Sequence, residues 1–246
     1  MALRRPVRAV VLAGGSGDWL AGHVRQVVGG LLPLAVVVAL SPAPIIAVVL
    51  MLLTPRAGGT STSFLVGWVA GLAGVTTLVL LLAGDVAAEG GRSSEVAAWA
   101  ELGLGVLLLA LAVQQWRSRP RPGEEPELPR WLVAIDRFTA PRAGGLGLAL
   151  SAVNPKVLLV CIAAGATIAG GGLSGVHATW SVVVFTIIAA STVAVPVLAH
   201  AVGRTRMTGP LQLLRGWLTA HGVTTAATLL LVLGVVLVGQ ALGGLA

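Results

Sequence analysis

Long runs of apolar residues constrain the fold of this chain more than any other feature. Six runs can be placed, and each is about as long as the roughly 20 residues that cross a hydrocarbon core. They lie at about 28–53, 61–84, 96–116, 144–169, 176–202 and 221–243. Only 10% of the residues are charged, whereas a soluble domain carries roughly 25%. The sequence therefore predicts an all-α membrane protein with six transmembrane helices.

The basic residues indicate topology rather than nucleic-acid binding. The net charge is +7, but the arginines fall mainly in short connections between apolar runs, where they orient the chain. Connections on one face carry ten arginines and those on the other face carry one, Arg92. We therefore expect a bacterial cytoplasmic (inner) membrane protein with the ten-arginine face inside and both termini extracytoplasmic, and no nucleic acid as partner. Four arginines near the N-terminus oppose this orientation: Arg4, Arg5, Arg8 and Arg25.

A stretch rich in proline and charge, Arg117 to Arg130, separates the runs into two sets of three. The predicted organisation is an N-terminal extension of unknown role (1–30), a first three-helix repeat (31–116), a cytoplasmic linker with an interfacial segment (117–142) and a second three-helix repeat (143–246). Because three is an odd number, the two halves would enter the membrane with opposite orientations. The chain is therefore predicted to contain two inverted repeats.

Two short sequence similarities between the halves, which we call the first and second echo, support the predicted inverted repeat. Ala39-Leu40-Ser41 recurs as Ala149-Leu150-Ser151, and "LGVLLLA" from Leu104 recurs as "LGVVLVG" from Leu233. Each echo lies at a corresponding place in the two halves. Gly67, Gly71 and Gly74 on the second span predict a face on which another helix packs closely.

The first and fourth spans are predicted to be broken at prolines. Proline lacks an N–H group, so it interrupts a helix interior but suits the first position of a new helix. Ser41 before Pro42 and Asn154 before Pro155 are residue types that cap helix N-termini. Each break would begin a half-helix whose free N–H groups and positive dipole end face the membrane midplane. Breaks at matching positions of an inverted repeat are a pointer to the binding site of a transporter.

Lys156, the only lysine of the chain, follows the second break directly. A charge at the bilayer centre costs about 3 kcal/mol on insertion scales, and intramembrane ionisable residues are functional by default. The predicted site for an anionic group comprises Ser41, Pro42, Pro44, Asn154, Pro155 and Lys156, with Ser191 and Thr192 of the fifth span facing the same cavity. The alternative is that the prolines only kink the helices, that Lys156 is neutral or internally paired, and that the hydroxyls bond to their own helix.

The remaining polar residues predict neither an enzyme nor a bound metal or cofactor. The four histidines lie at span ends or in loops, so no nucleophile and base are paired. The spans supply almost no carboxylates for a hard cation. Cys161 is the single cysteine and cannot cycle between dithiol and disulfide. Glu101 is expected near the outer surface of the third span, where water solvates it.

Four segments resemble a known family. They are "LPLAVVVALSPAPIIAVVLMLLTPRA", "WLVAIDRFTAPRAGGLGLALSAVNPKVLL", "AASTVAVPVLAHAVG" and "WLTAHGVTTAATLLLVLGVVLVGQALGGL". Together they resemble the glycopeptidolipid-addressing protein family, which is similar to the sulfolipid-addressing proteins and belongs to the wider lysine-exporter superfamily. The resemblance extends from about Leu31 to the C-terminus. Gly222 after His221 departs from it, because an asparagine is expected there.

The resemblance implies a six-span inner-membrane protein with inverted repeats and places Pro42, Pro44, Asn154, Pro155 and Lys156 at its centre. Family members are associated with delivering cell-envelope glycolipids, and superfamily relatives export amino acids or metal ions. We therefore expect a transporter or flippase/exporter for an anionic or amphiphilic substrate, with membrane lipids as partners. A small-solute (amino-acid-like) exporter and a non-transporting accessory protein of envelope lipid assembly are the alternatives. Energy coupling and a homo-oligomer are left open.

Overall fold

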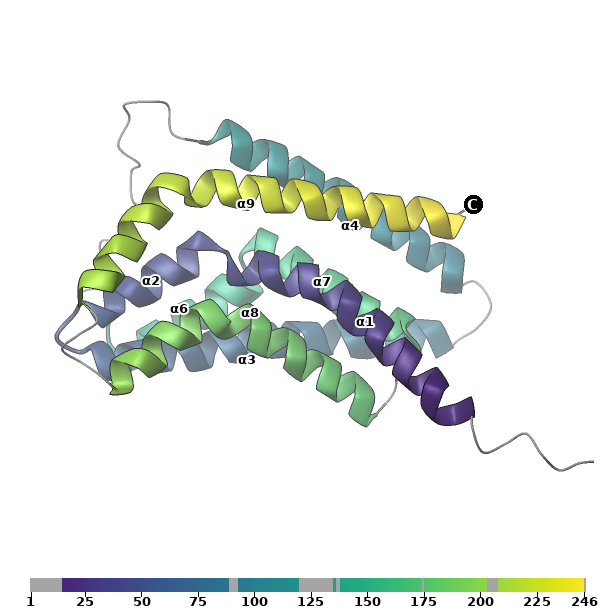
Figure 1. The fold of residues 1–246 in the computed structure, drawn as a ribbon, viewed down its shortest axis with the longest axis horizontal. Coiled ribbons are helices and arrows are strands. Elements are labelled where there is room, and N and C mark those ends of the chain that lie inside the picture. The colour runs from purple at the N-terminus through teal and green to yellow at the C-terminus, as the bar shows by residue number, and fades with distance from the viewer. Residues whose placement is uncertain are drawn as a thin grey trace, which may run out of the picture.

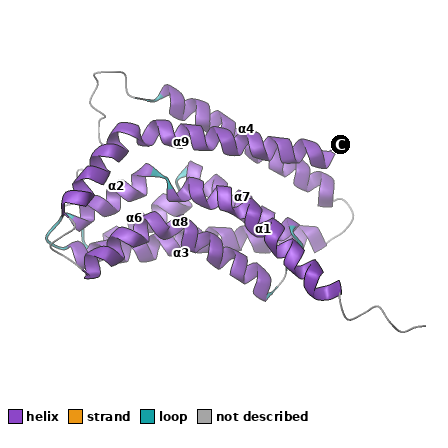
Figure 2. Ribbon diagram, in the orientation of Figure 1, coloured by secondary structure: helices purple, strands orange, loops and turns teal. Residues whose placement is uncertain are grey.

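The structure is a computed structural model, which describes residues 15–88, 93–119, 135, 138–173, 175–202 and 208–245. Within these residues every regular element is helical (Figures 1 and 2). The helices are α1 (Gly15–Ala39), α2 (Pro42–Leu52), α3 (Ala57–Ala88), α4 (Ser93–Arg117), α6 (Ala140–Ala152), α7 (Pro155–Gly170), α8 (Val176–Val202) and α9 (Thr208–Leu245). The prediction of an all-α protein is confirmed for the described part of the chain. α1 begins within the predicted N-terminal extension, and most of the predicted interfacial segment at 129–138 lies outside the described residues.

Three helices are long and apolar enough to cross a membrane, at Ala57–Ala83 within α3, at Val176–Val202 and at Gly222–Gly244 within α9. Two helix pairs qualify only together, because each pair bends sharply at a short break. The bend is 51° between α1 and α2 and 63° between α6 and α7. The described residues therefore hold three spans, or up to five if each bent pair is one span. These are the elements of a multi-pass membrane protein.

Both breaks lie at the predicted prolines. α2 begins at Pro42 and α7 begins at Pro155, so each proline takes the first position of a helix, where its missing N–H group has no helical partner to lose. In Figure 2 the two interruptions lie near the middle of the long axis of the bundle. The chain therefore has irregular backbone at two places well inside the apolar bundle.

The halves pack against each other in a symmetric pattern. α4, the last helix of the first half, packs along α9, the last helix of the second half (Figure 1). α3 packs against the broken pair α6 and α7, and in the same way α8 packs against the broken pair α1 and α2. Exchanging α1–α4 with α6–α9 therefore maps the α4–α9 contact onto itself and the other two sets of contacts onto each other.

Glycines allow close helix crossings. A Cβ at Gly67 would lie 2.0 Å from the Gly144 carbonyl oxygen, and one at Gly71 would lie 1.8 Å from Ser151 Oγ, so α3 and α6 approach at these positions. An added Cβ at Gly74 meets nothing within 4 Å. Two of the three glycines predicted to form a packing face are thus confirmed.

The crossing of α4 and α9 joins the two glycines of the second echo. A Cβ at Gly105 would lie 3.2 Å from the Gly234 carbonyl oxygen, and a Cβ at Gly234 would lie 3.1 Å from the Gly105 carbonyl oxygen. Corresponding residues of the two halves therefore face each other across this contact.

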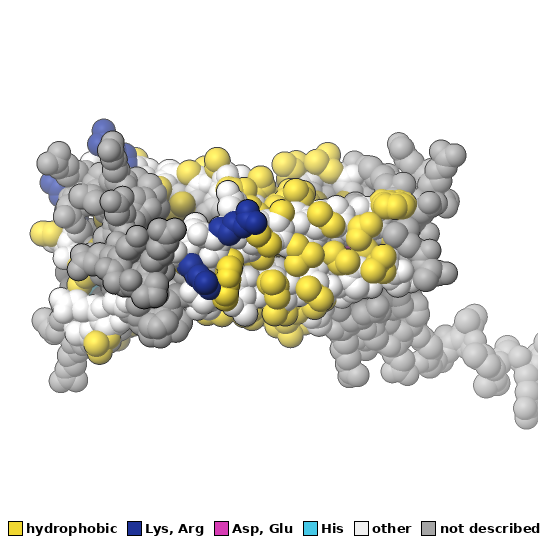
Figure 3. Space-filling model, turned by 90° about the horizontal axis from the view of Figure 1, so that it is seen from above, with side chains coloured by type: hydrophobic (Ala, Val, Ile, Leu, Met, Phe, Trp, Pro, Cys, Tyr) yellow, Lys and Arg dark blue, Asp and Glu magenta, His cyan; other side chains and the backbone are white. Residues whose placement is uncertain are grey.

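Apolar side chains cover much of one long face of the bundle, as lipid contact requires. In Figure 3 some of the visible lysine and arginine side chains lie at one end, and others lie near the middle among the apolar side chains. Among the described arginines, Arg56 precedes α3, Arg117 ends α4 and Arg142 lies in the first turn of α6. These three helix ends lie toward the same end of the bundle (Figure 1).

Candidate functional site

The first break, between α1 and α2, is partly covered by other helices, and Leu40 in this break is 38% exposed. Ser41 takes the N-cap position of α2 with an extended backbone, its side chain makes no capping hydrogen bond, and the residue is 1% exposed. The Thr192 hydroxyl of α8 donates a hydrogen bond to the carbonyl oxygen of Ala39, the last residue of α1. A carbonyl that the break leaves without a donor in its own helix is therefore paired by another helix.

Gly222 allows α9 to close over the first break. A Cβ at this position would lie 2.7 Å from Pro42 Cβ, closer than real Cβ contacts allow. The glycine that departs from the family pattern thus lies directly against the first proline of α2. Its role here is close packing.

The second break, between α6 and α7, is open by comparison. Val153 is 72% exposed, Pro155 is exposed, and Asn154 is partly exposed. Asn154 Oδ1 accepts a hydrogen bond of 3.1 Å from the backbone N–H of Lys156, so the predicted N-cap is confirmed at this break. The cap satisfies one of the N–H groups that the start of α7 leaves free.

Lys156 is the second residue of α7 and is partly buried. Within the described residues its ammonium forms neither an ion pair nor a hydrogen bond, so none of these residues supplies the internal pairing that was one of the two forms of the alternative interpretation. The positive end of the α7 dipole lies beside this ammonium, and a negative group would be stabilised by both. The arrangement can hold an anionic group.

The other predicted hydroxyls are occupied by backbone. Ser191 Oγ donates a 2.7 Å hydrogen bond to the Ile188 carbonyl of its own helix. Ser151, which ends the first echo and was not a predicted site residue, bonds in the same way to the carbonyls of Gly147 and Leu148 at 3.0 and 2.9 Å. Ser191 therefore behaves as the alternative interpretation expects, whereas Thr192 reaches a different helix.

The predicted site residues form two groups with different neighbours. Ser41, Pro42 and Pro44 lie at the first break with α8 and α9 against it, and Thr192 belongs to this group. Asn154, Pro155 and Lys156 lie at the second break, which is held on α3 through the contact of Ser151 with Gly71.

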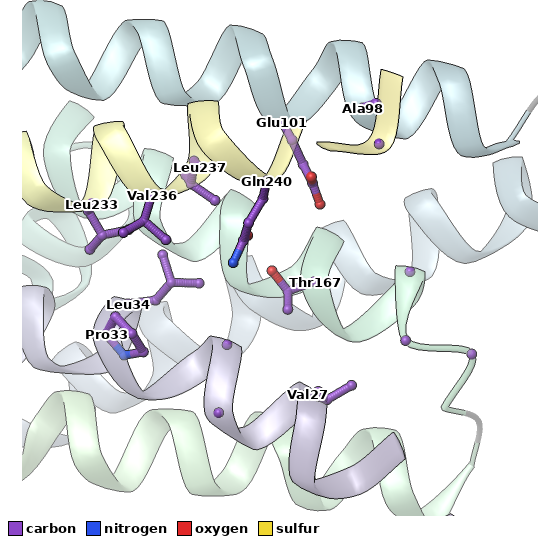
Figure 4. A pocket seen from close by; sticks show the side chains of 16 residues that line it. Val27, Pro33, Leu34, Ala98, Glu101, Thr167, Leu233, Val236, Leu237 and Gln240 are labelled. Atoms are coloured by element: carbon purple, nitrogen blue, oxygen red, sulfur yellow. The ribbon is translucent and has the colours of Figure 1, made fainter. Parts of the chain in front are cut away.

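A separate cavity of about 810 Å³ lies between α1, α4, α7 and α9. Three polar side chains from three different helices, Glu101, Thr167 and Gln240, point into it (Figure 4). Its lining residues are Val27, Gly29, Gly30, Pro33, Leu34, Ala98, Glu101, Thr167, Gly170, Gly171, Gly172, Leu233, Val236, Leu237, Gln240 and Gly244. None of the predicted site residues is among them. Glu101 was expected only to be solvated near the membrane surface. The sequence did not point to Gln240, because the residues that line the cavity with it lie mostly on other helices.

Comparison with known proteins finds one protein family. A family model described as "Sap, sulfolipid-1-addressing protein" matches residues 31–243. No curated protein and no solved structure matches the chain significantly. The matched residues contain both breaks, the glycine contacts and twelve of the sixteen residues that line the cavity. The chain belongs to the sulfolipid-1-addressing protein family, whose name connects it with the addressing of envelope lipids.

Proposed function

We propose that this chain is a transporter or flippase/exporter of the bacterial cytoplasmic membrane that moves an anionic or amphiphilic cell-envelope lipid, or a precursor of one. Family membership supports the lipid class. The observation that carries the proposal is the ammonium of Lys156, which is partly buried and without an internal partner among the described residues, at the start of a half-helix in the middle of the bundle.

The helix packing supports six spans arranged as two inverted repeats. Each half runs as a broken pair followed by two long helices, α1–α2, α3 and α4 in the first half and α6–α7, α8 and α9 in the second. When two equivalent residues of a repeat touch each other, they lie on the axis that relates the halves. Gly105 and Gly234 meet this condition, because each approaches the carbonyl oxygen of the other. In this arrangement α4 is the sixth span.

The second break is the substrate-binding element in this proposal. Backbone N–H and C=O groups that a break frees cannot face lipid and must be buried in protein or line a polar cavity. The first break meets this condition through Thr192 and the packing of Gly222 on Pro42. The second break is exposed and carries the only lysine, so its polar groups and Lys156 are available to an anionic headgroup.

Alternating access follows from the same geometry. Two packed units, α3 with α6 and α8 with α1, rock against each other around the breaks, and each unit combines helices from both halves. The substrate headgroup then meets Lys156 from one face of the membrane and leaves toward the other. The basic ends of α3, α4 and α6 orient the cytoplasmic face.

The test measures how fast lipid headgroups move across the membrane of vesicles that contain the purified protein. Lys156→Met is expected to lower the rate for a fluorescent anionic lipid by about tenfold or more, because a charge-assisted contact is lost. Lys156→Arg keeps the charge and should retain much of the rate. Arg142→Met removes a cation from the exposed start of the same helix pair and serves as the matched control.

Two outcomes would contradict the proposal. If Lys156→Met folds normally and moves the anionic lipid as fast as the unchanged protein, the ammonium is not part of the binding site. If the unchanged protein moves neither lipids nor small anions in vesicles, the accessory role in envelope lipid assembly replaces transport.

A further inference from the structure

The cavity between α1, α4, α7 and α9 lies far from the second break. Lys156 and Thr167 are both on α7 and are separated by eleven residues, which corresponds to roughly 16 Å along a helix axis. The cavity draws on both halves of the chain, with α1 and α4 from one and α7 and α9 from the other. It is therefore a separate feature from the site around Lys156.

The polar atoms of this cavity are mainly hydrogen-bond acceptors. The Glu101 carboxylate supplies two acceptor oxygens, and the Gln240 amide supplies one acceptor oxygen and one NH₂ donor. The Thr167 hydroxyl donates to the Ala163 carbonyl at 2.8 Å, which leaves its lone pairs to accept. Figure 4 shows all three side chains pointing into the same space.

This donor and acceptor pattern selects among ligand classes. An anionic group is disfavoured, because it would meet the Glu101 carboxylate. A bound metal ion is disfavoured, because no group of three histidine, cysteine or acidic residues exists among the described residues. A purely apolar group would leave the side chains of Glu101 and Gln240 without partners. A neutral group with several hydroxyls fits, because hydroxyls donate to the carboxylate and to Thr167 and also accept from Gln240.

The walls and size of the cavity suit a hydroxylated ring. Six of the sixteen lining residues are glycines, which leave room beside the backbone, and the apolar side chains of Leu233, Val236 and Leu237 form part of the wall. The volume of about 810 Å³ falls within the roughly 300–1,000 Å³ typical of small-molecule sites. We propose that this cavity is a binding site for a neutral polyhydroxylated group, such as a sugar ring, with Glu101, Thr167 and Gln240 as its hydrogen-bonding residues.

The binding test uses three probes that share one alkyl chain and differ in headgroup: hexyl glucoside, hexyl phosphate and hexylammonium. Calorimetric titration of the purified full chain in lipid nanodiscs, with empty nanodiscs subtracted, measures each affinity. Hexyl glucoside should bind tightest. Gln240→Leu and Glu101→Gln should each weaken its binding by about tenfold. Gln114→Leu, which changes an exposed glutamine of α4 outside the cavity, should leave the affinity unchanged.

A second pair of variants tests the location of the site without removing polar groups. Gly29 lines the cavity, and an added Cβ there meets nothing within 4 Å, so Gly29→Phe can fill the cavity without a backbone clash. Gly145→Phe has the same freedom but lies outside the cavity. Only Gly29→Phe should abolish glucoside binding. Equal affinities in both variants would overturn the proposal.

The headgroup series gives the other contradicting outcomes. Tighter binding of hexylammonium, lost in Glu101→Gln, would make the cavity a cation site, and tighter binding of hexyl phosphate would make it an anion site. Equal binding of all three probes would make it an apolar site only. The proposal is independent of transport: Lys156→Met should bind hexyl glucoside normally, so a failure of lipid movement and a failure of sugar binding are distinguishable.

Discussion

The two breaks, each before a proline that begins a helix, differ in how far the protein covers them. At the first break Leu40 is 38% and the N-cap Ser41 1% exposed, whereas at the second break the residue before the N-cap, Val153, is 72% exposed and the N-cap Asn154 is partly exposed. The first break is braced by side chains and backbone from α8 and α9, whereas the second carries its own cap from Asn154. The same local chemistry, a polar residue followed by proline, therefore produces a closed break in one half and an open break in the other.

We infer from this difference that the two breaks have different roles. At the first break α8 pairs the Ala39 carbonyl and α9 packs on Pro42, so we infer that this break is a fixed element of the bundle. A break that is exposed within a membrane protein must meet water, a polar ligand or another protein, because its free backbone groups cannot face lipid. The ammonium of Lys156, the substrate contact that we propose, is at the open break.

The largest effect is expected from disturbing the support of the open break. Gly71→Leu places side-chain atoms where Ser151 Oγ lies, since even a Cβ would come within 1.8 Å of that atom. Overpacking costs about 1–3 kcal/mol and more when the backbone cannot move, so we expect a loss of about 3 kcal/mol or more. Thermal unfolding in detergent and the yield of monodisperse protein measure it.

Gly74→Leu is the matched control for this change. It lies about one turn further along α3, where an added Cβ meets nothing within 4 Å. Its stability should stay within about 1 kcal/mol of the unchanged protein, as is usual for surface substitutions. If Gly71→Leu is tolerated equally well, the open break is not held by the crossing of α3 and α6.

A second expected effect is a difference in chemical access to the two breaks. In a Cys161→Ala background, which removes the single native thiol, Val153→Cys and Ser41→Cys each place one thiol at a break. A charged, membrane-impermeant thiol reagent should label Val153→Cys about tenfold faster or more, because reaction requires a water-exposed thiolate. Labelling rates measured by mass spectrometry in vesicles check this.

Ile187→Cys on α8 controls for lipid exposure. Ile187 is highly exposed on a predicted span, so its thiol should meet lipid and react slowly with the charged reagent. If Val153→Cys behaves like Ile187→Cys, the open break does not line a water-accessible path. If Ser41→Cys reacts as fast as Val153→Cys, the contrast between the breaks does not exist in the membrane.

The sequence predicts those features of the fold and of the candidate site that depend on local chemistry. Proline in an apolar run fixes where a helix must restart, so Pro42 and Pro155 locate both breaks, and Asn154 is a capping residue in any helix. Small residues at helical spacing locate the contact of Gly67 and Gly71 with α6. These features can be predicted without knowing which distant residues pack against them.

Features that depend on tertiary contacts could not be predicted from the sequence. Thr192 and Ala39 are 153 residues apart, and nothing near Thr192 indicates that it serves a carbonyl of α1. The cavity is made by four helices, so Glu101 and Gln240 become neighbours only after folding. The first echo is also misleading in register: Ser41 is an N-cap, but its sequence partner Ser151 lies inside α6, and the structural counterpart of Ser41 is Asn154.

The smallest effect is expected at the brace of the closed break, and it tests why that break is closed. Thr192→Val keeps the shape of the side chain but removes the donor to the Ala39 carbonyl. Leaving a buried acceptor unpaired costs about 1–3 kcal/mol, and hydrogen bonds between membrane helices are worth about 0.6–2 kcal/mol, so a loss of about 1 kcal/mol is expected. Ser191→Ala removes a hydroxyl that bonds only within α8 and should change stability less. The thermal unfolding temperature in detergent compares the two. A smaller loss for Thr192→Val than for Ser191→Ala would mean that water satisfies the Ala39 carbonyl, and the first break would then be open like the second.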